Sequence, residues 1–282
     1  MYRKKGMGWL RDLPDHRDLQ VKSTEIQEIR GQSKKVKKID KSLPPTVDLR
    51  QWCSPIEDQG DLGSCTANAG VGLLEYFQKR AYSKHLDASR LFLYKVTRNL
   101  MGIIGDEGAE LRTTMKAMVL FGIPPESYWP YKIEAFDEEP QAFCYAFAQS
   151  YKTTKYYRLD PAGQSTDKTM EAVKKSLAVG LPPMFGFTVY SSIPPSGDGK
   201  GEIPFPGPGD SVEGGHAIVA VGYDDKKKVG KDSGALLIRN SWGTGWGDKG
   251  YGWLPYSYVL KGLAVDFWTL VDSGFVDTEL FE

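Results

Sequence analysis

Cysteine and histidine are scarce in this 282-residue chain, and their scarcity narrows the chemistry that it can perform. The complete set is Cys53, Cys65, Cys144, His16, His85 and His216. No two of them show the C-x-x-C or H-x-x-x-H spacing of a protein-bound zinc ion, and three cysteines are too few for a disulfide framework. We therefore expect no metal and no organic cofactor. We interpret Cys53 and Cys144 as buried thiols, with a disulfide between them as the alternative.

Charge of one sign is not in excess, and long apolar runs are missing. The 36 basic and 36 acidic residues cancel, so nothing in the composition favours a nucleic-acid partner. No stretch is apolar enough to span a membrane, and the N-terminal segment lacks the apolar run of a secretory signal. We expect a cytoplasmic protein with no nucleic-acid or membrane partner; removal of an export signal from a longer precursor is the alternative.

Hydrophobic residues are numerous enough for a sizeable core. They make up 40% of the chain, which suits one two-part domain or two small domains. Residues 1–42 instead indicate an N-terminal arm, because residues 22–41 are rich in charge, serine and glutamine and are typical of a solvated linker. Within this arm, residues 9–15 carry apolar side chains and turn residues, so we expect them to dock on the rest of the protein.

The hydrophobic pattern predicts helices first and strands afterwards. The expected helices are 66–82, 88–96, 111–121, 140–151 and 167–179, and the expected strands are 183–190, 216–223, 235–240, 250–255 and 267–271. We therefore expect an α+β protein with a mainly helical lobe over about 43–153, a mainly β lobe over about 154–282 and a cleft between them. The segment 191–214, rich in glycine and proline, predicts a surface loop whose length favours a functional use.

Cys65 is the strongest candidate for a catalytic residue. It follows a loop marked by Gly60 and Gly63, and it comes directly before the helix predicted for 66–82. The positive end of a helix dipole stabilises a thiolate, which is the form of cysteine that attacks carbonyl groups. The alternative is an ordinary buried thiol.

His216 and Asn240 form a second candidate pair. His216 opens one predicted strand and Asn240 ends the next, and the midpoint between them falls at Lys228 in a polar loop. A hairpin with this register places Asn240 opposite His216, where its carboxamide oxygen can accept the imidazole N–H and fix the tautomer. A surface histidine and a simple turn at Asn240 are the alternatives.

Gln59 precedes Cys65 across the same glycine-marked loop. A side-chain amide at this place can donate to an oxyanion together with the backbone N–H of Cys65 at the helix start. A solvated loop glutamine is the alternative.

Together these motifs resemble those of the papain-like (C1 family) cysteine proteases, and in particular their prokaryotic type. The resemblance is carried by Leu-Pro-Pro-Thr-Val-Asp-Leu-Arg at 43–50, Asp-Gln-Gly at 58–60, Gly-Ser-Cys at 63–65, Gly-His-Ala at 215–217 and Asn-Ser-Trp-Gly at 240–243. The order of the motifs and the cysteine–histidine separation of roughly 150 residues match this family. The resemblance implies a papain-like two-lobe fold, with a helical N-terminal lobe, an antiparallel β-barrel-like C-terminal lobe and the active-site cleft between them.

The resemblance also implies a role for each motif residue. Cys65 is the nucleophile that forms a thioester acyl-enzyme, and His216 acts first as base and then as acid. The two are expected to form a thiolate–imidazolium pair. Asn240 orients His216, Gln59 completes the oxyanion hole, and Trp242 covers the contact between His216 and Asn240.

Substrate-binding residues are expected on both sides of the cleft, with peptides or proteins as substrates. The resemblance assigns a glycine-rich segment at 105–109 to pairing with the substrate backbone, and it places the loop at 191–214 near the opposite rim. The residues expected to bind substrate are Gly63, Ser64, Glu107, Gly108, Gly215 and Trp242.

The chain departs from the family pattern at three positions. Leu62 stands where the usual motif has a structural cysteine, so the disulfide of that cysteine is absent. Thr66 replaces the usual aromatic residue, and Gly215 stands where a plant enzyme has aspartate. The first two changes fit the prokaryotic form of the motif, and the third means that a pH profile cannot be transferred to this chain.

The expected function is that of a cysteine endopeptidase. Residues 1–42 occupy the place of an inhibitory propeptide, and we expect them to dock at the cleft through Trp9, Leu10 and Pro14 until cleavage near 34–41 releases them. An amidase or transpeptidase with the same Cys–His chemistry is the first alternative. A catalytically silent binding module is the second, and the intact set of four motif residues argues against it.

Overall fold

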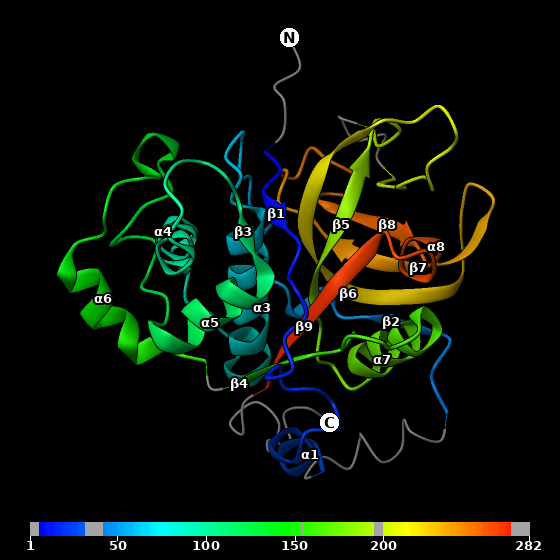
Figure 1. Cartoon of the computed structure of the whole chain (residues 1–282), viewed down its shortest axis with the longest axis horizontal. Helices are drawn as coiled ribbons and strands as arrows, with labels where there is room; N and C mark the ends of the chain where they lie inside the picture. Colours follow the sequence, from blue (N-terminus) through cyan, green and yellow to red (C-terminus); the bar gives the residue numbers. More distant parts are fainter. Residues whose placement is uncertain (1–5, 32–41, 154, 195–199, 272–282) are drawn as a thin grey trace.

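The computed structural model of the chain describes residues 6–31, 42–153, 155–194 and 200–271 (Figure 1). One lobe is built of helices and the other of an antiparallel sheet, and the N-terminal segment runs between them. The predicted α+β fold with two lobes is confirmed. In the described ranges no helix has the length and hydropathy needed to cross a bilayer.

The helical lobe is organised around one long buried helix. Its elements are α3 (Cys65–Tyr82), α4 (Arg90–Met101), α5 (Leu111–Leu120) and α6 (Ala142–Ala148), with 3-10 turns at Arg50–Trp52, Ile133–Ala135 and Gln149–Tyr151. Helix α3 lies between the other helices and the sheet, and every residue from Cys65 to Phe77 is buried. The start of α3 is therefore fixed at the junction of the two lobes.

The β lobe contains a seven-stranded sheet in which β4-β9-β5-β6-β7-β8 follow one another and β2 pairs with β6. The strands are β2 (Thr46–Asp48), β4 (Lys155–Arg158), β5 (Met184–Tyr190), β6 (Val212–Val229), β7 (Asp232–Arg239), β8 (Tyr251–Pro255) and β9 (Ala264–Val271). Helices α7 (Thr166–Ala178) and α8 (Ser257–Leu260) pack in the same lobe. The described strands form an open sheet, with no closed barrel.

The N-terminal arm is more structured than its composition predicts. Strand β1 (Trp9–Leu10) pairs in parallel with β3 (Ala109–Glu110) of the helical lobe. Helix α1 (Thr24–Gly31) occupies part of the region predicted to be a solvated linker, and that prediction is wrong there because Ile26 is fully buried and holds the helix on the protein. The predicted cleavage region at 34–41 lies outside the described residues, and the boundary at residue 42 stays a prediction.

Candidate active site

Cys65 begins helix α3, and its side chain is fully buried. Burial raises the pKa of the Cys65 thiol to about 11, although backbone N–H groups of Ala217 and of Gly8 in the arm act in the opposite direction. A charged sulfur loses more hydration than these two donors return. With the arm in place, the sulfur is therefore a neutral thiol.

His216 lies in β6, and Asn240 comes directly after β7. Nε2 of His216 is 2.7 Å from Oδ1 of Asn240, so the predicted contact is present. A carboxamide oxygen only accepts hydrogen bonds, which assigns the proton of the neutral ring to Nε2 and the lone pair to Nδ1. This Nδ1 is buried, and no described residue hydrogen-bonds to it.

The hairpin that brings these two residues together differs from the predicted one. Strands β6 and β7 continue into a tight turn, in place of the polar loop expected at 225–232. Register shifts along β6 pair Arg239 with Val219. Such irregularities insert extra residues into one strand. Asn240 therefore reaches His216 from beyond the last paired residue rather than from directly opposite.

Two aromatic rings enclose the imidazole of His216. Trp242 stacks on it with ring centroids 4.5 Å apart, and Phe187 meets it edge-on at 5.9 Å. Burial lowers the pKa of His216 to about 4, while the hydrogen bond with Asn240 acts in the opposite direction. The arm-covered site thus disfavours both charges of the expected thiolate–imidazolium pair.

The side-chain amide of Gln59 is held at both ends. Its oxygen accepts the hydroxyl of Ser241 at 2.6 Å, and its nitrogen donates to the carbonyl of Leu62 at 2.9 Å. The same nitrogen is 3.1 Å from the carbonyl oxygen of Gly6 in the arm. One amide hydrogen therefore fixes the loop before Cys65, and the other reaches the peptide that fills the cleft.

The arm covers the thiol with its backbone. The N–H of Gly8 lies against Cys65, and the carbonyl of Gly8 accepts the N–H of Ala109 at 2.7 Å. A Cβ at Gly8 would lie 1.8 Å from the carbonyl oxygen of Gly63, so only glycine lets the chain pass this close.

Trp9 of the arm packs on a floor of two glycines. A Cβ at Gly186 of β5 would lie 1.9 Å from the indole, and one at Gly215 of β6 would lie 2.9 Å from it. The indole N–H is buried, and no hydrogen-bond partner is present for it among the described residues. The contact therefore rests on apolar packing alone.

Beyond the cleft, Asp12 places a carboxylate in a buried polar site. It accepts the indole N–H of Trp268 at 2.7 Å and the backbone N–H of Arg112 at 3.2 Å, while its own N–H donates to Asp266 at 2.9 Å. Arg112 lies in the first turn of α5, whose N-cap residue Glu110 makes no side-chain cap, so the arm supplies this cap. Burial, and then the carboxylate of Asp266, raise the pKa of Asp12 to about 7.

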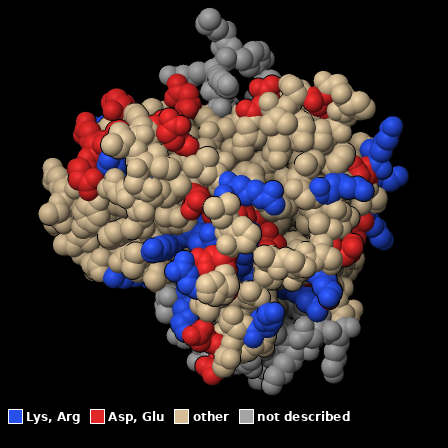
Figure 2. Space-filling model, in the orientation of Figure 1, with Lys and Arg blue, Asp and Glu red and all other residues tan. Residues whose placement is uncertain are grey.

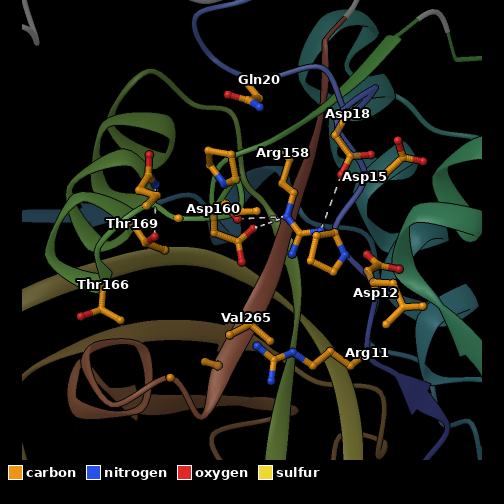
Figure 3. A pocket seen from close by; sticks show the side chains of 18 of the residues that line it. Arg11, Asp12, Asp15, Asp18, Gln20, Arg158, Asp160, Thr166, Thr169 and Val265 are labelled. Carbon is orange, nitrogen blue, oxygen red and sulfur yellow. Dashed lines mark hydrogen bonds and ion pairs between the residues drawn. The ribbon is translucent and has the colours of Figure 1, made fainter.

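Arg158 of β4 joins this part of the arm to the sheet (Figure 3). Its guanidinium lies 2.5 Å from Asp266, 3.0 Å from Asp160 and 3.8 Å from Asp18 of the arm. Asp18 also pairs with Arg112 at 2.8 Å. Arg158, Asp160 and Asp18 border a cavity of about 1040 Å³ beside the arm. Figure 2 shows acidic and basic side chains interspersed along this junction of the lobes.

The residues predicted to bind substrate fall into two groups. Those that border the arm in the cleft are Gly63, Glu107, Gly108 and Gly215. The side chain of Ser64 is directed elsewhere, because its hydroxyl lies 2.6 Å from that of Tyr131. Trp242 stacks on the imidazole, as its expected covering role requires.

Sequence reasoning missed four residues that support the site, namely Ser241, Tyr94, Asp106 and Gly186. Ser241 belongs to the Asn-Ser-Trp-Gly motif, so a signal for it was present. Asp106 lies in the glycine-rich segment at 105–109, but no role was predicted for it, and Tyr94 stands in no recognisable motif. Only the tertiary structure brings the two residues to Gly63.

The backbone N–H of Ala217, the residue after His216, reaches the thiol of Cys65, while Asn240 contacts His216 and its neighbour Ser241 contacts Gln59. A thiol, an imidazole and two side-chain amides gathered at one junction of two lobes are typical of a cysteine peptidase. The family model of the papain family cysteine proteases matches residues 43–259. The chain belongs to this family, as its motifs predict.

Two relatives align with nearly the whole chain. An uncharacterised peptidase C1-like protein of Acanthamoeba polyphaga mimivirus is 34% identical over 277 residues, which cover 94% of this chain and 86% of the relative. The crystal structure of xylellain, a cysteine protease from Xylella fastidiosa, is 34% identical with a TM-score of 0.75, and the match covers 96% of this chain and 97% of xylellain. Matches of this extent include most of the arm.

Animal relatives align with a smaller part. Cathepsin K of Gallus gallus is 29% identical over 215 residues, which are 74% of this chain and 58% of the relative. The comparisons confirm the predicted family and the predicted function, and the chain is a cysteine endopeptidase.

Proposed function

We propose that Cys65, His216, Asn240 and Gln59 carry out peptide-bond hydrolysis by this endopeptidase, and that the arm holds the site closed. The observation that carries the catalytic assignment is the imidazole of His216, bonded to Asn240 on one side and free to accept a proton on the other. A base held in one tautomer is what nucleophilic attack by a thiol requires.

In the proposed reaction, Nδ1 of His216 takes the thiol proton, and the sulfur of Cys65 attacks the substrate carbonyl carbon to form a C–S bond. The amide nitrogen of Gln59 and the backbone N–H of Cys65 stabilise the resulting oxyanion. Collapse breaks the C–N bond as the imidazolium gives its proton to the leaving amine. Water, deprotonated by His216, then attacks the thioester and releases the acid product and the free thiol.

The arm blocks this reaction at two atoms. The carbonyl of Gly6 occupies the donor of Gln59, and the N–H of Gly8 covers the sulfur of Cys65, so a substrate carbonyl is kept from both. When the arm leaves, water returns to the site. The burial that raises the pKa of Cys65 and lowers the pKa of His216 is then removed. The thiolate–imidazolium pair then forms in the open cleft.

The contacts of the arm also suggest how substrate binds. The backbone N–H of Ala109 pairs with the substrate backbone, as it does with the carbonyl of Gly8, and Gly108 leaves room for the peptide to lie against it. The glycine floor under Trp9 accepts a large apolar side chain, because Gly186 and Gly215 leave the room that a Cβ would fill.

Thiol labelling tests both parts of the proposal. Full-length protein is treated with a thiol-directed peptidyl epoxide, and mass spectrometry locates the adduct. Gly8→Leu displaces the arm, and Leu13→Ala, at an arm side chain that is 76% exposed, is the matched control. We expect labelling at Cys65 about 100-fold faster in Gly8→Leu than in wild type or Leu13→Ala, because the open population sets the rate. Cys65→Ala and His216→Ala should not react at this site.

Each outcome separates the two parts. Equal rates in wild type, Gly8→Leu and Leu13→Ala would reject the arm as a block and leave the catalytic assignment intact. A lack of labelling at Cys65 in Gly8→Leu would contradict the catalytic assignment and favour a silent binding module. Partitioning of the acyl-enzyme between water and an added amine distinguishes an endopeptidase from a transpeptidase.

A further inference from the structure

One peptide group connects Gln59 to the helical lobe. The peptide between Leu62 and Gly63 offers its carbonyl to the nitrogen of Gln59 at 2.9 Å. Its N–H lies 2.9 and 3.0 Å from the two carboxylate oxygens of Asp106. Because a peptide group is planar, the direction of its N–H fixes the direction of its carbonyl. Asp106 therefore determines where the carbonyl that holds Gln59 points.

The same carboxylate also reaches the strand that pairs with the arm. Asp106 accepts the hydroxyl of Tyr94 at 2.5 Å, and the oxygen of Tyr94 accepts the N–H of Gly108 at 3.2 Å. The next N–H along the chain, that of Ala109, donates to the backbone of the arm. Asp106 thus joins the loop of Gln59 to the strand that a bound peptide meets.

The loop has no covalent tether at this place. Leu62 is buried at the position of the structural cysteine of the family motif, and it cannot form a disulfide. The loop instead fits closely around the carboxylate, because a Cβ at Gly63 would lie 2.8 Å from Asp106. Hydrogen bonds to a carboxylate are charge-assisted and are stronger than neutral ones, which suits them to hold a loop in a fixed orientation.

We propose that Asp106 is a positioning residue for the oxyanion site. It orients the peptide between Leu62 and Gly63, and through that peptide the amide of Gln59, while Tyr94 transmits the same constraint to Gly108. The proposal rests on the proposed role of Gln59. Asp106 acts through these neighbours and touches no reacting atom.

The test compares two reactions of Cys65 in Asp106→Asn, made in full-length Gly8→Leu protein so that the cleft is open. Asparagine keeps the volume but sets an N–H against the N–H of Gly63. We expect kcat for a peptide amide to fall about 10–30-fold, less than for loss of an oxyanion donor, because Ser241 still holds Gln59. Alkylation of Cys65 by iodoacetamide forms no oxyanion and should change less than about twofold.

Two further variants sharpen the result. Tyr94→Phe cuts the connection to Gly108 and should raise KM about threefold with little change in kcat, because substrate pairing is affected alone. Asp137→Asn is the matched control, because Asp137 holds the loop that carries Asp106, through the N–H of Gly105 at 3.2 Å and through Arg98 at 2.7 Å. Asp137→Asn should lower the melting temperature. The ratio of kcat for the peptide amide to the alkylation rate of Cys65 should stay constant.

Equal losses of hydrolysis and alkylation in Asp106→Asn, or no loss of either, would overturn the proposal. Gln59→Ala in the same background is the reference. If it leaves kcat unchanged, the oxyanion role of Gln59 itself fails; if it lowers kcat while Asp106→Asn does not, only the positioning role fails. Where Asp106→Asn does not fold, an unchanged KM in Tyr94→Phe would count against the proposal.

Discussion

The two parts of the N-terminal arm are held by different kinds of contact. Residues 6–10 lie in the cleft, contain no charged side chain and meet Gln59 and Cys65 through backbone groups. Residues 11–20, which we call the anchor, are held by ion pairs and hydrogen bonds to α5, β4 and β9. In the proposed closed state, the first part blocks the site and the second part provides the specific attachment.

This difference separates two proposed tasks of the arm, which are to cover the active site and to stay attached to the protein. Backbone hydrogen bonds and glycine contacts are available to many peptides, so the cleft segment resembles a substrate in what it offers. The anchor instead depends on complementary charges at fixed places, which a general peptide substrate does not offer. The lifetime of the closed state should therefore depend on the anchor more than on the segment that covers the thiol.

Removing Arg158, the cation of β4 that faces the anchor, should have the largest effect. Arg158→Met leaves Asp160 and the fully buried Asp266 without their cation, and loss of one partner of a buried ion pair costs about 3–5 kcal/mol. The free energy of unfolding in urea measures this loss. Arg17→Met, in an exposed pair with Asp15, is the control and should leave the unfolding midpoint unchanged. Similar midpoints for the two variants would contradict a stabilising role for Arg158 in this buried ion-pair cluster.

The pH should act on the anchor through Asp12. Its carboxyl has a pKa of about 7 when docked, against an ordinary value of 3.8, so the docked arm holds a proton that the free arm releases. Docking is then strongest below about pH 4 and weakens as the pH rises through 7. The docking equilibrium constant falls by at most about tenfold per pH unit. We therefore expect the labelling rate of Cys65 in wild type to rise between pH 5 and 7 when it is divided by the rate in Gly8→Leu at the same pH. The groups that face Asp12 are Arg112, Asp266 and Trp268.

Asp12→Asn provides the control for this pH dependence. The carboxamide does not titrate, so the ratio of labelling rates should become flat over the same range. A rise that persists in Asp12→Asn would assign the pH dependence to another group.

Loss of a peripheral anchor contact should have an intermediate effect. Asp18→Ala removes the carboxylate that Arg112 contacts at 2.8 Å, and hydrogen bonds between charged groups contribute about 2 kcal/mol. Labelling of Cys65 should therefore become about 30-fold faster. Asp15→Ala, three positions away, removes an exposed pair with Arg17 and should label like wild type. Equal acceleration by both variants would indicate a general loosening of the arm.

The smallest change is expected in the cleft segment. Trp9→Phe keeps an aromatic ring over Gly186 and removes a buried N–H that has no hydrogen-bond partner among the described residues. The lost contact area weakens docking of the arm, whereas removal of the desolvation penalty of the N–H strengthens it. The labelling rate of Cys65 should therefore change less than about threefold. An acceleration comparable to that of Asp18→Ala would show that the cleft segment, too, supplies specific attachment.

The placement of the proposed catalytic residues could be predicted because it depends on short motifs and local order. Cys65 follows a glycine loop and begins a helix, and the motif around Asn240 lies one hairpin beyond His216. Even there the register was predicted incorrectly, because the irregular pairing of β6 and β7 leaves no trace in the hydrophobic pattern. The contact itself survived because Asn240 lies just past the end of its strand.

The contacts of the anchor and the hydrogen bonds of Asp106 to Gly63 and Tyr94 could not be predicted from the sequence. Asp12 meets Asp266 across 254 residues, and a single aspartate carries no local signal for such a partner. Helix α1 was hidden by its charged composition, although Ile26 in it is fully buried. Long-range polar contacts of this kind depend on the completed fold.

The bond between Asp12 and strand β9 has a consequence for biosynthesis. The arm is made early, yet its hydrogen bonds to Asp266 and Trp268 need a strand that is translated after nearly all of the described chain. The arm therefore cannot be fully seated on a nascent or truncated polypeptide. Its docking reports that β9 has taken its place in the sheet, so full seating of the arm follows the pairing of that strand.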